Sequence, residues 1–257
     1  MNWAQLYESL GQQLKDGVDL PWWQDAFVGI YKAFFEEGRW QFYLDGVLTT
    51  LWITAMALIL GIVLGVVVAV IRTTHDQQRL GRHNPVLGVL NVICKIYVTI
   101  IRGTPMMVQL LIMGFIIFKS SREYTLVGTL TLGINSGAYV AEIVRGGLMS
   151  VDIGQSEAGR SLGLNYLDTM RFIVIPQAFK NILPALGNEF ITLFKDTALI
   201  SAIGGKELVY AAKSIGSKTY DVMYPYLGIA IIYLLMVMLF TWLLGILERR
   251  LRQSDRR

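Results

Sequence analysis

The sequence predicts an all-α, polytopic membrane protein with five transmembrane helices, and two observations carry this prediction. First, 54% of the 257 residues are hydrophobic and only 16% are charged, whereas a soluble domain carries about 25% charged residues. Second, residues 46–71 and 224–247 contain no charged side chain, and each stretch exceeds the roughly 20 apolar residues that cross a bilayer. We expect three further, irregular spans between these two.

Residues 1–45 form an acidic, aromatic-rich segment before the first span. Seven acidic residues oppose three basic ones. Trp22, Trp23 and Phe27 are among the aromatic side chains, and such rings favour the headgroup layer of a membrane. We therefore expect an N-terminal arm of one or two amphipathic helices on the membrane surface, with a loosely ordered tail as the alternative. The expected organisation is this arm at 1–45, a transmembrane domain at 46–250 and a tail at 251–257.

The three middle spans are expected at residues 86–118, 123–151 and 188–212. In the first of them, the run Arg102-Gly103-Thr104-Pro105 predicts a break in the helix. Broken backbone at membrane depth is tolerated only where protein buries it or where it lines a cavity. The glycines of the second span indicate close helix–helix packing; they are Gly133, Gly137, Gly146 and Gly147. The third is the weakest, because Lys195, Asp196 and the pair Gly204-Gly205 interrupt it.

Basic residues in the flanking segments predict the orientation, since cytoplasmic loops carry an excess of lysine and arginine. The connection after the first span holds Arg72, Arg79 and Arg82 against Asp76. The C-terminal tail holds Arg249, Arg250, Arg252, Arg256 and Arg257 against Glu248 and Asp255. Both segments should face the cytoplasm. Five spans then place the N-terminus outside and the loop at 152–187 inside.

Charged side chains at membrane depth cost about 2.5–3.5 kcal/mol on insertion scales, so each should face protein or water and be paired. Arg102 and Glu142 are expected to lie deepest, whereas Lys95 and Arg145 lie near the ends of their spans. Two interpretations remain open for the deep pair. They form an ion pair that holds two helices together, or they line a substrate path.

The loop at 152–187 contains a helical elbow. Ser156 is a suitable N-cap for a helix that begins at Glu157, and Gly163 suits the left-handed position that follows a helix end. Asn165 is a second N-cap, with Asp168 three residues later as a variant of the capping box. Pro176 is expected to help close the second helix. This elbow is either a docking surface for a cytoplasmic partner or an interfacial helix pair.

The elbow resembles the cytoplasmic coupling loop of ABC importer permeases, whose pattern is E-A-A, three residues, G, nine residues, then I-x-L-P. Five residues match at the right spacing, namely Glu157, Ala158, Gly163, Ile173 and Pro176. Gly159 replaces the third alanine, and Ile175 replaces the leucine. Three flanking runs, which begin at Arg102, Gly137 and Lys195, are similar to the polar amino acid branch of that family. The resemblance covers about residues 46–250.

This resemblance implies the type I importer fold and a half-transporter in a bacterial inner membrane. A second copy or a homologous permease would complete the path, with a homodimer preferred. Two cytoplasmic ATPase subunits would hold ATP and magnesium, and an extracytoplasmic binding protein would deliver a polar amino acid. The sequence contains no P-loop run G-x-x-x-x-G-K-[ST], in keeping with a separate motor chain that binds the nucleotide. The expected coupling residues are Glu157, Ala158, Gly159, Gly163, Leu164, Ile173 and Pro176.

A zwitterionic amino acid in a low-dielectric passage needs donors for its carboxylate and acceptors for its ammonium group. We expect Arg102 and the amides of the break to donate, and Glu142 and the carbonyls freed by the break to accept. The expected path residues are Thr50, Arg102, Gly103, Thr104, Asn135, Tyr139, Glu142 and Thr197.

Other classes of protein fit the sequence less well. Two histidines and one cysteine do not predict a zinc or copper site, and no block of like charges predicts a nucleic-acid partner. The absence of paired carboxylates argues against a membrane enzyme, so we expect a non-catalytic subunit. The remaining alternative is a small oligomeric channel or gated pore that ATP does not drive.

Overall fold

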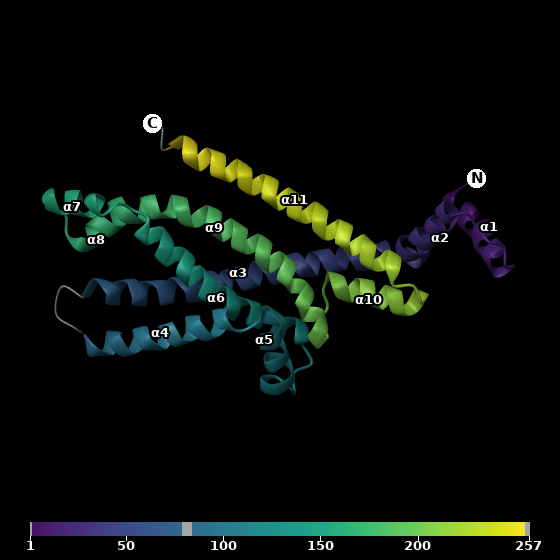
Figure 1. Ribbon diagram of the computed structural model, residues 1–257, viewed down its shortest axis with the longest axis horizontal. Coiled ribbons are helices and arrows are strands. Elements are labelled where there is room, and N and C mark those ends of the chain that lie inside the picture. Colours follow the sequence, from purple (N-terminus) through teal and green to yellow (C-terminus); the bar gives the residue numbers. More distant parts are fainter. Residues whose placement is uncertain (1, 79–83, 255–257) are drawn as a thin grey trace. The chain divides into compact units, whose positions relative to one another are not determined.

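The computed structural model describes residues 2–78 and 84–254, and this part of the chain is helical throughout its regular structure (Figure 1). The α-helices are α1 Trp3–Lys15, α2 Trp22–Phe34, α3 Trp40–Gln77, α4 Pro85–Gly103, α5 Met106–Ile112, α6 Tyr124–Met149, α7 Ile153–Ser161, α8 Tyr166–Thr169, α9 Ile175–Asp196, α10 Leu208–Thr219 and α11 Met223–Ser254. The expected all-α class is confirmed. Of the residues used to predict the orientation, Arg79, Arg82, Asp255, Arg256 and Arg257 lie outside the described residues.

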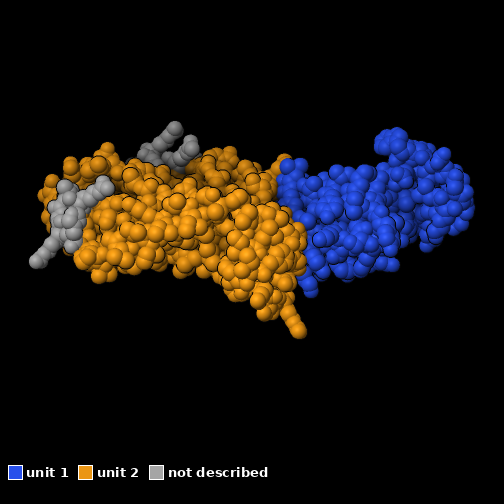
Figure 2. Space-filling model, turned by 60° about the horizontal axis from the view of Figure 1, so that its bottom comes forward, with its two compact units in different colours: residues 1–50, 206–236 blue, residues 51–205, 237–257 orange. Residues whose placement is uncertain are grey.

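The chain divides into two compact units, which Figure 2 colours separately. The first comprises residues 1–50 and 206–236, and the second comprises residues 51–205 and 237–257. The boundary expected at residue 45 does not coincide with this division. The N-terminal arm instead shares a unit with α10 and the first part of α11.

In the first unit, α1 and α2 form a helical hairpin held by aromatic rings. Tyr7 of α1 stacks on Tyr31 of α2, with their ring centroids 4.5 Å apart. The Tyr7 hydroxyl donates to Glu36 at 2.8 Å, and burial, together with this carboxylate, raises the pKa of Tyr7 to about 12. The prediction of helices in the arm is therefore confirmed. Their position on a membrane surface stays a prediction.

The arm also packs onto the rest of the first unit. Lys32 of α2 donates to the Thr219 carbonyl at the end of α10, at 2.9 Å. Gly29 of α2 lies directly against the Tyr224 ring of α11, so that a Cβ atom there would overlap the ring. Because these contacts join segments far apart in the sequence, the arm is an integrated part of its unit.

In the second unit, α6 lies against α3, α4 and α9. A Cβ atom on Gly61 of α3 would lie 2.7 Å from the Ser136 hydroxyl of α6, and one on Gly137 of α6 would lie 2.9 Å from Leu64 Cβ of α3. Glycine therefore permits the close approach of these two helices. The packing role predicted for the α6 glycines is confirmed for those at 133, 137 and 147. A Cβ atom on Gly146 would meet none of the described residues within 4 Å, so a packing role there stays a prediction.

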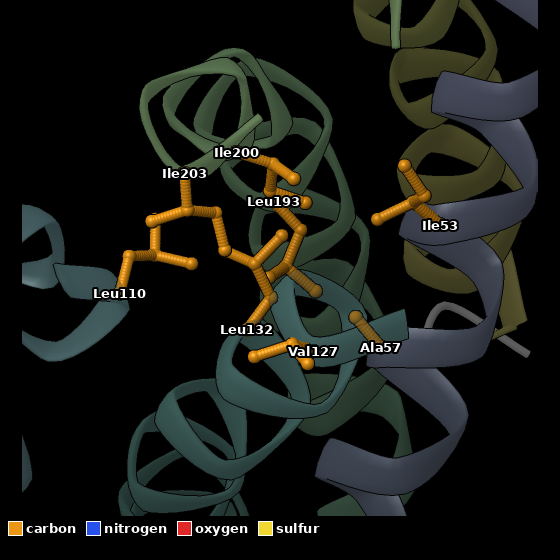
Figure 3. Packing of buried hydrophobic residues seen from close by; sticks show 8 residues of the cluster. All are labelled: Ile53, Ala57, Leu110, Val127, Leu132, Leu193, Ile200 and Ile203. Carbon is orange, nitrogen blue, oxygen red and sulfur yellow. The ribbon is translucent and has the colours of Figure 1, made fainter. Parts of the chain in front are cut away.

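A buried apolar cluster joins five segments of the second unit (Figure 3). Its members are Ile53 and Ala57 of α3, Leu110 of α5, Val127 and Leu132 of α6, Leu193 of α9, and Ile200 and Ile203 of the 3₁₀ segment that follows α9. This cluster fixes α5, α6 and α9 relative to one another, because burial of each valine, leucine or isoleucine side chain contributes about 1.5–3 kcal/mol.

The helices of the structure match some of the predicted membrane spans and differ from others. The break after Arg102 is confirmed, because α4 ends at Gly103 and α5 begins at Met106. Among the described residues, three helical segments are long and apolar enough to cross a membrane: Glu36–Asp76, Pro85–Gly103 and Met223–Leu251. α6 covers a fourth predicted span but carries polar and charged side chains. The count of five therefore stays a prediction.

The span predicted at 188–212 is interrupted at the residues that the sequence indicated, but the helix that enters it begins earlier than expected. α9 begins at Ile175, inside the loop expected at 152–187, and it ends at Asp196. The chain then tightens into a 3₁₀ segment, Thr197–Ile203, which Gly204 ends in the left-handed conformation at φ +89°. Pro176 lies in the first turn of α9, and the π-helical turn Met170–Val174 directly precedes that helix.

Candidate functional site

The elbow begins at α7, whose N-cap is Asp152. The Asp152 carboxylate accepts from the Gly154 amide at 2.6 Å. The prediction of Ser156 as the N-cap is wrong, because Ser156 lies in the middle of α7. An aspartate four residues earlier competes for the same role, and aspartate and serine are equally good caps.

The turn of the elbow is a Schellman motif. Gly163 has φ +81°, its amide donates to the Arg160 carbonyl at 2.9 Å, and the Leu164 amide donates to the Gly159 carbonyl at 3.1 Å. Both bonds satisfy carbonyls that the end of α7 would leave without partners. The left-handed position predicted for Gly163 is confirmed.

The second half of the elbow begins at Asn165, as predicted. The Asn165 side chain accepts from the Asp168 amide at 2.9 Å and donates to the Asp168 carboxylate at 2.6 Å. α8 passes through a π-helical turn, Met170–Val174, directly into α9. Pro176 therefore does not close this helix, which corrects the expectation from the sequence.

The corner exposes an apolar knob, which we define as Leu162, Tyr166 and Leu167. Leu162 is 80% exposed and Leu167 is 75% exposed. Figure 1 shows α7 and α8 lying together beside the start of α9. Leu164, which the sequence analysis names as a coupling residue, is half-buried and does not belong to the knob.

The seven expected coupling residues fall into two groups. Glu157, Ala158, Gly163 and Pro176 are exposed along the elbow. Gly159 is buried, and Leu164 and Ile173 are half-buried. A Cβ atom on Gly159 would lie 3.0 Å from Ile173 and from Thr169, so the glycine that replaces the family alanine sits where α7 touches the π-helical turn.

The break between α4 and α5 is capped by Gln109, a residue that the sequence analysis missed. The Gln109 amide nitrogen donates to the Ile101 carbonyl at 2.8 Å and to the Thr104 carbonyl at 3.1 Å. Its oxygen accepts from Asn135 of α6 at 3.0 Å. These carbonyls were expected to accept from a substrate, and the structure shows them already bonded. The available signal was a glutamine in an apolar run, four residues after Pro105.

Glu142 of α6 is the centre of a charge cluster. Its carboxylate accepts from Arg72 of α3 and, at 2.9 Å, from Arg145 of α6. Arg102 of α4 lies 4.0 Å away and is 44% exposed, whereas Arg72 is 15% exposed. The expected Arg102–Glu142 ion pair is therefore the weakest of three contacts. Arg72, which we assigned to a loop, belongs to α3 and is the most buried of the three partners.

Six of the eight expected path residues lie around the end of α4 and one face of α6. Arg102, Gly103 and Thr104 are exposed at the end of α4. Asn135, Tyr139 and Glu142 follow one another at helical spacing on α6. The Arg102 guanidinium lies 5.2 Å from the centre of the Tyr139 ring, a distance at which a cation interacts with an aromatic face.

The other two path residues do not join this group. Thr197 is completely buried, and its hydroxyl donates to the Phe194 carbonyl at 2.7 Å. Thr50 is also completely buried and belongs to the first unit, where its hydroxyl accepts from the Leu208 amide at 3.2 Å. Each hydroxyl thus bonds to the backbone.

Two further acidic residues escaped the sequence analysis. Glu189 of α9 accepts from Ser136 of α6 at 2.7 Å. Glu207 of the first unit is buried, and its carboxylate accepts from the amides of Val209 and Tyr210 at the start of α10. No local sequence pattern indicates the contact of Glu189. Glu207 directly precedes α10 and caps it, so its position before a helix was the available signal.

Known proteins with similar sequences cover most of the chain. The glutamine transport system permease protein GlnP of Escherichia coli (strain K12) is 32% identical over 81% of this chain and 92% of its own length. The arginine transport system permease protein ArtQ of Bacillus subtilis (strain 168) is 33% identical over 83% of this chain and 94% of its own.

Two solved structures that resemble this chain are also transporters. An amino acid ABC transporter crystallised with histidines is 40% identical, with a TM-score of 0.73 over 82% of this chain and 94% of that one. The MetNI methionine ABC transporter is 20% identical with a TM-score of 0.70, over 84% of this chain and 99% of that one, which shows the shared fold alone.

The family described as "binding-protein-dependent transport system inner membrane component" matches residues 85–253. That range includes the elbow, the break after Arg102 and Glu142 itself, but not its partner Arg72. The resemblance found in the sequence is thereby confirmed. This chain belongs to the family of binding-protein-dependent transport system inner membrane components.

Proposed function

We propose that this chain is the non-catalytic transmembrane subunit of an ATP-driven importer for a polar amino acid. An extracytoplasmic binding protein delivers the amino acid, and two separate ATPase subunits bind ATP and magnesium. A second copy of this chain, or a homologous permease, completes the path, with the homodimer preferred. The N-terminus faces outward, and the elbow and the C-terminus face the cytoplasm.

The observation that carries this proposal is the elbow. Its exposed apolar knob offers an anchor of the kind that dominates protein–protein binding energy. The Schellman turn and the Asn165 cap hold this knob on an ordered support that continues directly into α9. A push on the knob by a closing ATPase dimer therefore reaches a helix that packs along α6.

The substrate contacts proposed for this importer lie on α4 and α6. Arg102 and Glu142 offer opposite charges to a zwitterion, and Asn135 and Tyr139 add polar groups on the same face of α6. The relatives named for glutamine and arginine transport support this class of substrate. Tyr139 is partly exposed, so a ligand beside Arg102 also meets an aromatic ring.

The experiment compares two glycine variants of the permease reconstituted with its ATPase. Gly163→Leu places a side chain on a residue with left-handed backbone. Gly88→Leu in α4 is the matched control, because Gly88 has ordinary helical backbone and a Cβ atom there has no neighbouring atom within 4 Å. A third variant, Leu162→Asp, places a charge on the knob. We expect Gly163→Leu and Leu162→Asp to reach the membrane but to lower amino-acid-stimulated ATP hydrolysis about tenfold or more. Gly88→Leu should retain the activity.

Unchanged amino-acid-stimulated ATP hydrolysis in both elbow variants would remove the elbow from the mechanism. Amino acid flux through the native chain without any ATPase would instead favour the channel interpretation.

A further inference from the structure

The second unit contains a cavity of about 490 Å³ between the elbow and the ends of α3 and α6. Its polar wall comes from Thr73 and Asp76 of α3, Arg145 of α6 and Ser156 of α7. Met170 and Val174 of the π-helical turn contribute to an apolar wall. The volume lies within the ~300–1,000 Å³ typical of small-molecule sites, and the lining combines apolar surface with a few polar groups, as such sites do.

The guanidinium group of Arg145 has hydrogen-bond donors that have weak partners or none among the described residues. One terminal nitrogen donates to the Glu142 carboxylate at 2.9 Å. The other donates to the Met149 sulfur at 3.1 Å, and a thioether is a weak acceptor. The Nε atom has no hydrogen-bond partner among the described residues. Because Nε is itself buried, a carboxylate in the cavity would bond to the terminal nitrogens, as a stronger, charge-assisted acceptor than the thioether.

The charges around the cavity favour a zwitterion. Three guanidinium groups, those of Arg72 in α3, Arg102 in α4 and Arg145 in α6, share the single Glu142 carboxylate, so the cluster that Arg145 joins carries excess positive charge. On the α3 side, the Asp76 carboxylate is 48% exposed and lies 3.6 Å from Nδ1 of His75, a contact that is ionic only when His75 is protonated. A ligand with a carboxylate and an ammonium group finds an opposite charge at each end.

We propose that this cavity binds a free amino acid, with its carboxylate on Arg145, its ammonium group on Asp76 and its side chain against Met170 and Val174. The inference rests on the proposed function, because the cavity joins the elbow to the ends of α3 and α6. A bound amino acid holds the elbow against those helices, and so accumulated product slows further import. The phosphoethanolamine headgroup of a lipid shares this charge pattern, and the experiment separates the two sources.

The test uses the complete importer in phosphatidylglycerol nanodiscs, which contain no zwitterionic lipid, with radiolabelled L-arginine and L-glutamine in equilibrium dialysis. Met149→Glu supplies Arg145 with a carboxylate from the protein itself, and Met149→Gln is its neutral match. Asp76→Asn removes the site for the ammonium group, and Glu123→Gln, at the opposite end of α6, is the control for charge. We expect Met149→Glu and Asp76→Asn to weaken binding about tenfold, with both controls within about threefold of the native affinity.

The second measurement uses proteoliposomes whose ATPase side faces the bath. Amino acid added to the bath should lower the import rate of the native protein and of Met149→Gln, relative to each protein's own rate without it. Met149→Glu should resist this inhibition. Resistance of that kind supports the cavity as the inhibitory site.

Equal binding in all variants, while import proceeds, would overturn the cavity site and leave the proposed function standing. A native complex that does not import, but still shows Met149-dependent binding, would instead count against the proposed function and for the site. Added phosphatidylethanolamine that the amino acids fail to displace would assign the cavity to a lipid headgroup and overturn the proposal.

Discussion

Glu142 organises the charged side chains of the second unit. Its carboxylate is 21% exposed and bonds to Arg72 and Arg145, which come from different helices. Removal of one partner from such a pair leaves the other charge poorly solvated, and this costs more than the pair itself contributes. Arg102 is more exposed and more distant, so its attraction to Glu142 is screened by solvent.

We predict that Glu142→Gln lowers the free energy of unfolding by about 3 kcal/mol, because Arg72 then lacks its counter-charge. Arg102→Gln should cost less than about 1 kcal/mol. The double variant Arg72→Gln/Glu142→Gln should recover part of the loss, since the two residues are coupled. Thermal unfolding of the purified permease measures all three. An Arg102→Gln effect as large as that of Glu142→Gln would make Arg102 the main partner.

At the scale of elements, two interruptions of helical structure position the proposed sites. The break between α4 and α5 leaves carbonyls that Gln109 satisfies, and Asn135 ties this cap to α6. The elbow interrupts the path from α6 to α9 with a capped turn. In both places side chains supply the hydrogen bonds that the backbone lacks, because unsatisfied polar groups are costly away from water.

Gln109→Leu should lower the free energy of unfolding by about 2–3 kcal/mol, because the carbonyls of Ile101 and Thr104 lose their donor. Met107→Leu is the matched control on the same helix, since Met107 is exposed and a change between these side chains is nearly isosteric. Thermal unfolding of both variants in detergent provides the comparison. Equal stability of the two proteins would show that water or another donor replaces the amide.

At the scale of the whole molecule, the chain consists of two units that α3 and α11 both enter. The first unit contains the N-terminal helices, and the second contains the elbow, the break and the Glu142 cluster. The proposed orientation assigns the N-terminal helices and the elbow to opposite sides of the membrane. It rests on the basic residues in the segments after the first span and after the last.

Cysteine labelling of intact cells tests this orientation. An Asp16→Cys variant should react with an impermeant thiol reagent added outside, and a Leu162→Cys variant should react only after the cells are opened. Cys94 is buried, so the parent protein is the control and should stay unlabelled. The reverse pattern would place the elbow outside and separate it from any ATPase.

The sequence by itself determined the features that depend on a few neighbouring residues. Apolar runs marked α3 and α11, the proline after Arg102 marked the break, and Gly163 and Asn165 marked the turn of the elbow. Each of these signals acts through backbone geometry or a cap within about four residues. Where two good caps lie four residues apart, as Asp152 and Ser156 do, the local pattern does not decide between them, and the structure shows Asp152 at the start of α7.

Only the tertiary structure decided which side chains meet. Arg72 and Glu142 are 70 positions apart, and Gln109 reaches across the break to Asn135 on another helix. Thr50 and Thr197 were expected to line the substrate path, but in the folded chain both side chains are completely buried. A helix's hydrophobic pattern indicates that a face is covered, but it does not name the covering helix, so charge partners and cavities arise only once α3, α4, α6 and α9 have packed together.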